Sequence, residues 1–115
     1  MFQRFKVTKS PNVSGNLEVF VDKQKDLLIH TVYLTLPAYT SNVTRDVSIE
    51  RPDGEVLGTE KAVYRTSEAI GLVFDQKFLL TIYDPILKID THSVIVTAVG
   101  DITVDIVYEE VEYER

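Results

Sequence analysis

The sequence predicts an all-β protein, folded as an antiparallel, jelly-roll-like β-sandwich of eight or nine strands. Its composition favours strands, with 16 Val, 11 Thr and 9 Ile against 4 Ala, 3 Gln and 1 Met. Short stretches of alternating apolar and polar residues recur between turn-forming residues, as they do in β-sandwiches. No helical pattern is long enough to connect two parallel strands. An up-and-down barrel is the alternative arrangement of the same strands.

Length and charge narrow the classes of protein to which the chain can belong. Its 115 residues suffice for one domain with a buried core, and we expect a single domain over 1–115. A net charge of −6 repels phosphate groups, so nucleic acid is not an expected partner. The absence of cysteine excludes disulfides and cysteine-ligated metals. No stretch has the length of a signal peptide's apolar core or of a membrane span, so we expect neither a membrane partner nor secretion by a signal peptide.

Four strands are predicted in the first half of the chain, over 4–8, 17–21, 27–36 and 47–49. The third is the longest and ends at Pro37, which cannot donate a hydrogen bond to a neighbouring strand. Apolar residues fall on both faces of this strand, so we expect protein to cover both. One face holds Leu28, Val32, Leu34 and Leu36, and the other holds Leu27, Ile29 and Tyr33.

The second half of the chain begins with a predicted turn over 51–54. Pro52 presets its own φ angle and Gly54 can adopt the left-handed conformation, which together favour a tight turn. Short strands are predicted at 61–65 and 77–84, and a further pair of strands begins near residue 89.

The stretch 93–110 predicts a β-hairpin around Gly100 and Asp101. Glycine at the first central position fits a two-residue type II′ turn, and that turn determines which residues of the two strands face each other. One face of the hairpin is then almost continuously apolar and should point into the core. It comprises Ile95, Thr97, Val99, Ile102, Val104 and Ile106.

The opposite face of this hairpin is half apolar, which is more than a solvated sheet face needs. Either another segment of the same chain covers it, or it stays open and binds another chain, because exposed apolar patches mark interaction sites. In the second case Asp105 needs a basic partner, and we expect Arg4, Lys6 and Lys9 of a neighbouring chain to supply it. The predicted interface comprises Val94, Val96, Thr103, Asp105, Val107, Arg4 and Lys6.

Signals for catalysis and metal binding are weak. The two histidines, His30 and His92, lie in predicted strands, and a metal site would require both of them together with a carboxylate. The hairpin register places His92 opposite Glu109, which should raise the pKa of the imidazole. No serine lies in a nucleophile-elbow motif, and no run of aspartates resembles a calcium-binding loop. We therefore expect a non-enzymatic protein with no metal or other cofactor.

Six tyrosines keep a second class of function open. Tyrosine rings can stack on sugars, so the loops "AYTSN" (38–42) and "YRTSEAIG" (64–71), with Tyr39, form an alternative recognition end for a carbohydrate or another ligand. The chain has no Trp and most tyrosines lie in predicted strands, so packing in the core or in an interface is the interpretation we favour.

The stretches "RPDGEVLG", "LTIYDPIL" and "VTAVGDITVDIVYE", in a short, acidic chain of strands without cysteine, resemble the small β-sandwich virion proteins of tailed bacteriophages. These include capsid decoration or cement proteins. The resemblance implies a structural role on a particle, as a homo-oligomer or bound to a capsid or tail protein, and a location in the virion or the host cytoplasm. It concerns the character of the whole chain, so no functional residue is carried over from it.

Overall fold

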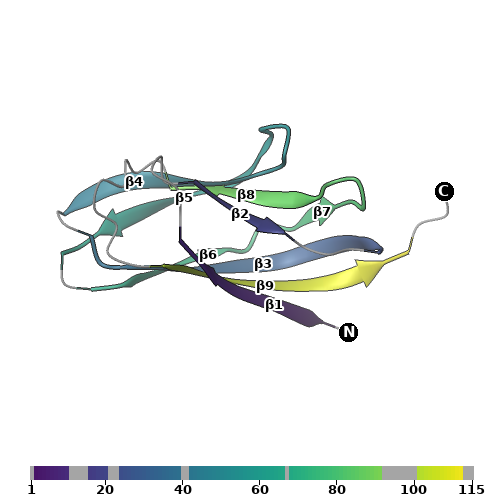
Figure 1. Ribbon diagram of the computed structural model, residues 1–115, viewed down its shortest axis with the longest axis horizontal. Coiled ribbons are helices and arrows are strands. Elements are labelled where there is room, and N and C mark those ends of the chain that lie inside the picture. The colour runs from purple at the N-terminus through teal and green to yellow at the C-terminus, as the bar shows by residue number, and fades with distance from the viewer. Residues whose placement is uncertain are drawn as a thin grey trace.

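The computed structural model describes residues 2–10, 16–20, 24–39, 42–66, 68–91 and 101–112. These residues form nine strands and no helix, arranged in two antiparallel sheets that pack face to face (Figure 1). The all-β sandwich predicted from the sequence is confirmed. The strands are β1 (Gln3–Lys9), β2 (Asn16–Phe20), β3 (Asp26–Leu36), β4 (Val43–Glu50), β5 (Val56–Tyr64), β6 (Ile70–Phe74), β7 (Phe78–Leu80), β8 (Ile86–Asp90) and β9 (Ile102–Val111).

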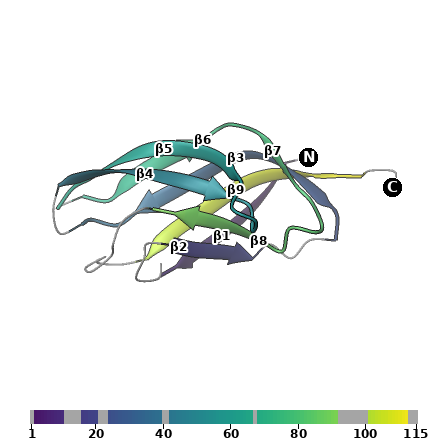
Figure 2. The same cartoon turned by 90° about the horizontal axis from the view of Figure 1, so that it is seen from above.

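The strand order is that of a jelly roll. Strands from the start of the chain pair with strands counted back from its end: β1 with β9, β2 with β8, β3 with β6, and β4 with β5. These pairs alternate between the sheets, giving the orders β1-β9-β3-β6 and β2-β8-β4-β5, as in a long antiparallel ribbon wrapped into a sandwich. Figure 2 shows β2, β8, β4 and β5 side by side in that order. Each strand of an up-and-down barrel would instead pair with the next in sequence.

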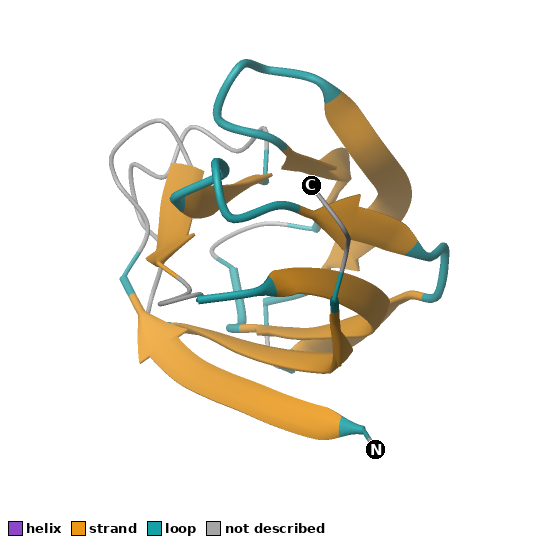
Figure 3. Cartoon of the chain, turned by 90° about the vertical axis from the view of Figure 1, so that its right-hand side faces the viewer, coloured by secondary structure: helices purple, strands orange, loops and turns teal. Residues whose placement is uncertain are grey.

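One strand, the short β7, lies outside these two orders. It lies end to end with β6 along one edge of β3. Leu27–Ile29 of β3 pair with β7, and Val32–Leu36 pair with β6. The sequence predicted one strand over 77–84, but the chain leaves β3 after Leu80 to make a turn. Figure 3 views the sandwich from the end at which both termini lie, with the two sheets as separate layers.

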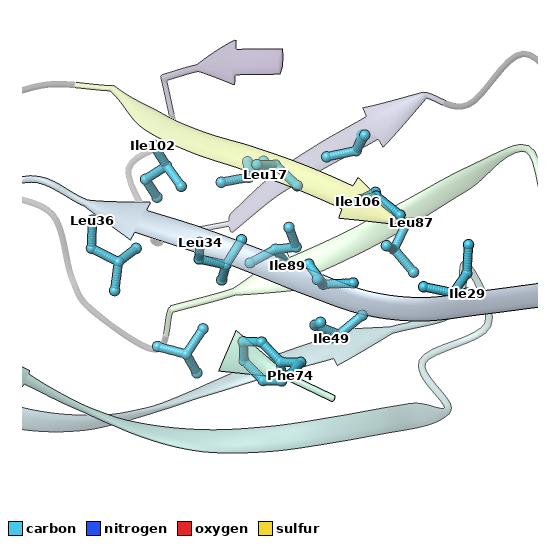
Figure 4. Close-up of a cluster of buried hydrophobic side chains, with 14 of the residues drawn as sticks. Leu17, Ile29, Leu34, Leu36, Ile49, Phe74, Leu87, Ile89, Ile102 and Ile106 are labelled. Carbon is cyan, nitrogen blue, oxygen red and sulfur yellow. The ribbon is translucent and has the colours of Figure 1, made fainter. Parts of the chain in front are cut away.

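The core lies between the two sheets and is filled from both (Figure 4). In β9, Ile102, Val104 and Ile106 are at most 2% exposed, which confirms their predicted place in the core. Ile95, Thr97 and Val99, predicted for the same face, lie outside the described residues. Other strands contribute Leu17, Val19, Leu27, Ile29, Val32, Leu34, Leu36, Val47, Ile49, Ala62, Tyr64, Phe74, Leu80, Leu87 and Ile89.

A bulge in β3 corrects the predicted division of this strand into two covered faces. Ile29 pairs with Tyr108 and Thr31 with Val107, so His30 is an extra residue opposite β9. An extra residue reverses the alternation of side chains. Leu27 and Ile29 therefore point into the same core as the apolar residues after the bulge, and the other face of β3 is open, with Tyr33 39% exposed.

The predicted turn after β4 is confirmed. Gly54 has a φ of +95°, which is the left-handed conformation that glycine allows. The Gly54 amide donates to the Arg51 carbonyl at 2.9 Å, and the Arg51 amide donates to the Glu55 carbonyl at 2.9 Å. This closed turn connects β4 to β5.

The predicted pairing within the 93–110 hairpin is wrong for its second strand. Both edges of β9 are occupied by distant parts of the chain, since Thr103 pairs with Thr8 of β1 on one side and with Thr35 of β3 on the other. The first strand of the predicted hairpin, 93–99, lies outside the described residues. Along β9, pairing between the two ends of the chain, which jelly-roll topology requires, occupies both edges.

Candidate interaction face

The outer face of the β1-β9-β3-β6 sheet, which we call the β9 face, carries most of the residues that the sequence predicted as an interface. It looks downward in Figure 1, away from the second sheet. Side chains that alternate with the buried ones in each strand form this face. It comprises Arg4, Lys6 and Thr8 of β1, Thr103, Asp105 and Val107 of β9, Thr31, Tyr33 and Thr35 of β3, and Val73 of β6.

One row of this face crosses all four strands. Lys6 pairs with Asp105, Asp105 with Tyr33, and Tyr33 with Val73. The row changes from charged at the β1 edge to apolar at the β6 edge. Tyr33 is 39% exposed and Val73 is 49% exposed, so the two form a continuous exposed apolar contact across β3 and β6.

An ion pair stands beside this row. The Arg4 guanidinium donates two hydrogen bonds to Asp105, from Nε to Oδ1 at 3.2 Å and from Nη2 to Oδ2 at 2.9 Å. The same guanidinium lies 5.9 Å from the centre of the Tyr33 ring, within the range of a cation–π contact. Arg4 therefore links β1, β9 and β3 across the face.

This ion pair corrects the predicted partner of Asp105. We expected Arg4 and Lys6 from a neighbouring chain, whereas Arg4 of the same chain neutralises Asp105. The cause is the β1–β9 pairing, which places Lys6 opposite Asp105 and Arg4 on the adjacent diagonal. Lys6 remains exposed and forms no ion pair within the described part of the chain. Charge compensation for Asp105 thus does not need a second molecule.

A row of threonines borders the face on one side. Thr8, Thr103 and Thr35 are register partners on β1, β9 and β3, and the Thr8 and Thr103 hydroxyls are 3.1 Å apart. Gly71 continues the row on β6. Because the side chains of this row are short, the larger Tyr33 side chain projects further from the sheet than they do.

His30 and Glu109 border the face on the other side. His30 Nε2 donates to Glu109 Oε2 at 2.8 Å, and the Phe2 and His30 rings pack in a T-shaped arrangement with ring centres 4.6 Å apart. The hydrogen bond from His30 lowers the pKa of Glu109 below its ordinary value. The sequence paired Glu109 with a histidine, but with His92, which lies outside the described residues. The bulge in β3 places His30 there instead.

The outer face of the other sheet, which we call the β4 face, has a different composition. Its central row is Glu18, Lys88 and Glu50, which are register partners on β2, β8 and β4. A further row pairs Asp46 with Lys61, whose charged groups are 3.3 Å apart. Oppositely charged neighbours of this kind are typical of a solvated sheet face.

Of the predicted interface residues, five are brought together and two cannot be placed. Thr103, Asp105 and Val107 of β9 lie beside Arg4 and Lys6 of β1 on the β9 face. Val94 and Val96 lie outside the described residues. Sequence reasoning missed Tyr33 and Val73, because the pairing of β3 with β9 and β6 is not visible in local patterns.

The alternative recognition loops do meet at one end of the sandwich. The Tyr39 amide donates to the Arg65 carbonyl at 2.8 Å, and the Thr66 amide donates to Asn42 Oδ1 at 3.2 Å. The Tyr39 ring packs on Tyr64, with ring centres 5.0 Å apart, and Tyr64 is only 3% exposed. The tyrosines at this end therefore contribute to core packing.

Two aspartates at strand ends, Asp26 and Asp84, hold a turn of the backbone. Asp26 Oδ1 accepts from the Ile82 amide at 2.9 Å, and Asp84 Oδ2 accepts from the Thr81 amide at 3.0 Å. Both carboxylates therefore hold a turn. Within the described residues, no group of three or more His, Asp or Glu side chains could hold a metal ion.

In the part of the chain that the structure describes, no helix is long and apolar enough to cross a membrane. No protein-family model, curated protein or solved structure matches the chain.

Proposed function

We propose that this protein is a non-enzymatic structural protein that assembles through the β9 face, by binding further copies of itself or a larger protein scaffold. The observation that supports this most strongly is the exposed pair of Tyr33 and Val73 on neighbouring strands, beside Arg4 and Lys6. An apolar patch with charged residues at its border is the composition of protein–protein interfaces, in which tyrosine and arginine are enriched.

The resemblance to bacteriophage virion proteins extends this proposal to a particle. Decoration and cement proteins of that class have a structural role, and the jelly roll is a common architecture for capsid proteins. We accordingly propose a virion component, with a capsid or tail protein or other copies of this chain as the partner.

The experiment compares two valines of almost equal exposure on opposite faces. Val73 is 49% exposed on the β9 face and Val63 is 46% exposed on β5 in the β4 face. We expect Val73→Glu to reduce the mass measured by light scattering at high protein concentration, and Val63→Glu to leave it unchanged. Circular dichroism and thermal unfolding verify that both variants fold. Equal masses for the wild type and both variants would refute self-assembly through the β9 face.

Ligand binding by the loops is the second candidate, supported by the hydrogen bonds that join Tyr39 to Arg65 and Thr66 to Asn42. A glycan array tests it. Specific binding that is lost in Arg65→Ala and kept in Val73→Glu would favour this candidate over assembly. Our proposal predicts no specific glycan binding.

A further inference from the structure

A rigid turn projects from the end of the sandwich at which β7 connects to β8. It comprises Thr81–Asp84, and we call it the Tyr83 turn. Its backbone closes through the Asp84 amide and the Thr81 carbonyl at 3.0 Å. Asp84 Oδ2 accepts from the Thr81 amide at 3.0 Å and from the Thr81 hydroxyl at 3.1 Å, and the Tyr83 amide donates to that hydroxyl at 3.2 Å. The conformation of the turn is therefore fixed in the isolated chain.

Two further side chains anchor the turn to the rest of the fold. Asp26 of β3 is buried, and it accepts the Ile82 amide at 2.9 Å. Arg51 donates to Asp84 Oδ2 at 3.0 Å and to Glu55 Oε2 at 3.2 Å, which joins the Tyr83 turn to the turn between β4 and β5. In Figure 1 the turn between β4 and β5 rises at the top of the molecule, and the connection between β7 and β8 lies to its right.

This fixed turn presents apolar side chains to solvent. Tyr83 is 74% exposed, the highest value among the large hydrophobic residues that the structure describes as exposed, and Ile82 beside it is 37% exposed. Solvation alone gives no reason for a turn held so firmly to display a tyrosine and an isoleucine. A rigid exposed tyrosine is a favourable interface anchor, because little conformational entropy is lost when it is buried.

The charges around the turn are mainly negative. The turns 51–54 and 81–84, with Glu55, carry the acids Asp53, Glu55 and Asp84 against the single base Arg51. By contrast, the exposed edge of the β9 face carries Arg4 and Lys6, and residues 1–10 contain no acid. The two surfaces have opposite charge, and each presents an exposed tyrosine with an aliphatic neighbour.

We propose that the Tyr83 turn of one copy docks on the β9 face of a second copy. This inference rests on the proposed function and names the occupant of the β9 face. Tyr83 and Ile82 would bury against Tyr33 and Val73, while Glu55 would approach Lys6. Opposite charges favour this orientation of the two copies and speed their encounter.

The position of the two surfaces makes the contact heterologous. The Tyr83 turn connects strands of different sheets at one end of the sandwich. The β9 face is instead the outer surface of one sheet, directed away from the other sheet (Figures 1 and 3). One surface cannot cover the other within a single chain. A contact between two different surfaces is head-to-tail, so it generates a closed ring or an open filament.

The main experiment is a charge exchange between the two surfaces, followed by light scattering. Glu55→Lys and Lys6→Glu each place like charges against one another, and each variant alone should self-associate at least about tenfold more weakly than the wild type. In a mixture, both contacts between unlike copies pair opposite charges, since the turn of Glu55→Lys meets the changed face of Lys6→Glu and Glu55 of the latter meets Lys6 of the former. The mixture should therefore form alternating head-to-tail assemblies that neither variant forms alone. Glu68→Lys, at an exposed loop position near the opposite end, is the matched control and should associate like the wild type.

A second variant tests the apolar anchor. Tyr83→Ser keeps the backbone amide that donates to Thr81 and removes a side chain that is 74% exposed, so the fold should be retained. We expect association at least about tenfold weaker than in the wild type, the loss expected for an interface anchor.

The possible results separate this inference from the proposed function. If Val73→Glu reduces the mass but Tyr83→Ser and the charge exchange do not, the β9 face assembles with another surface and the docking of the Tyr83 turn is refuted. If none of these variants changes the mass, self-assembly through the β9 face and the docking of the Tyr83 turn are both refuted. Restored association in the mixture, with weak association of each variant alone, supports the head-to-tail contact.

Discussion

The β9 face and the β4 face belong to the same sandwich but have different surface chemistry. On the β4 face, the exposed valines Val63 and Val56 of β5 stand opposite the polar residues Thr44 and Glu50, and Asp46 stands opposite Lys61. On the β9 face, Val73 stands opposite the exposed Tyr33, and the charged residues Arg4, Lys6 and Asp105 lie on β1 and β9. A sandwich requires apolar residues only on the inner faces of its sheets. The fold alone therefore does not require the exposed Tyr33–Val73 pair of the β9 face, and this pair is the observation behind the proposed assembly.

The comparison first predicts that core residues of the two sheets contribute equally to the free energy of unfolding. Ile106 of β9 and Ile49 of β4 are each 1% exposed, on opposite sides of the same core. Replacing either one by alanine should reduce the free energy of unfolding by about 2–5 kcal/mol in denaturant unfolding, because a buried isoleucine leaves a cavity. A loss below about 1 kcal/mol for Ile106→Ala alone would show that β9 is not a central core strand.

The second prediction concerns the ion pairs on the two faces. Arg4 contacts Asp105 through two hydrogen bonds, and the Asp105 side chain is only 20% exposed. Lys61 and Asp46 share a single contact between side chains that are 75% and 54% exposed. Double-mutant cycles with Arg4→Met and Asp105→Asn should give a coupling free energy of about 0.5–1 kcal/mol, and the Lys61–Asp46 cycle should give less than about 0.3 kcal/mol. The reverse ranking would contradict the described β1–β9 register.

The smallest expected effect is the pH dependence of the stability that Glu109 contributes at the border of the β9 face. The pKa of Glu109 lies below its ordinary value of 4.5, because the carboxylate accepts a hydrogen bond from His30. A carboxyl whose pKa is lowered by folding adds stability above its unfolded pKa, and this stability is lost as the pH falls through the folded value. The stability difference between the wild type and Glu109→Gln should therefore shrink as the pH falls below about 4.5.

Unfolding measured over this acidic range checks that prediction, with Glu68→Gln as the control for removing an exposed carboxyl. A Glu109→Gln variant whose deficit stays constant across the range would contradict the described His30–Glu109 contact.

Local patterns were sufficient to predict the fold class and the inward side of β9. Alternation identified Ile102, Val104 and Ile106 as core residues, and they are buried. Turn chemistry identified Gly54 in its left-handed conformation. Both signals depend on neighbouring residues and on the period of a strand, which the sequence contains directly.

The partners of β9 could not be predicted in the same way. Pairing β9 with β1 joins Lys6 to Asp105 across nearly the whole chain, and no local turn encodes it. The bulge at His30 reverses the alternation of β3, so Tyr33 reads as covered in the sequence but lies on an open face. The sequence therefore places Thr103, Asp105 and Val107 on the outer side of β9, while the exposed pair Tyr33 and Val73 comes from strands that only the topology brings to the same face.

The most direct test of the central claim is the solvent protection of Val73 relative to Val63. Their exposures in the single chain are 49% and 46%, so a paramagnetic agent dissolved in the buffer should relax their methyl NMR signals equally in a monomer. At high protein concentration we expect the Val73 methyl groups to be protected from the agent and the Val63 methyl groups to remain accessible. Equal relaxation of the two valines at every concentration, or protection of Val63 alone, would contradict assembly through the β9 face.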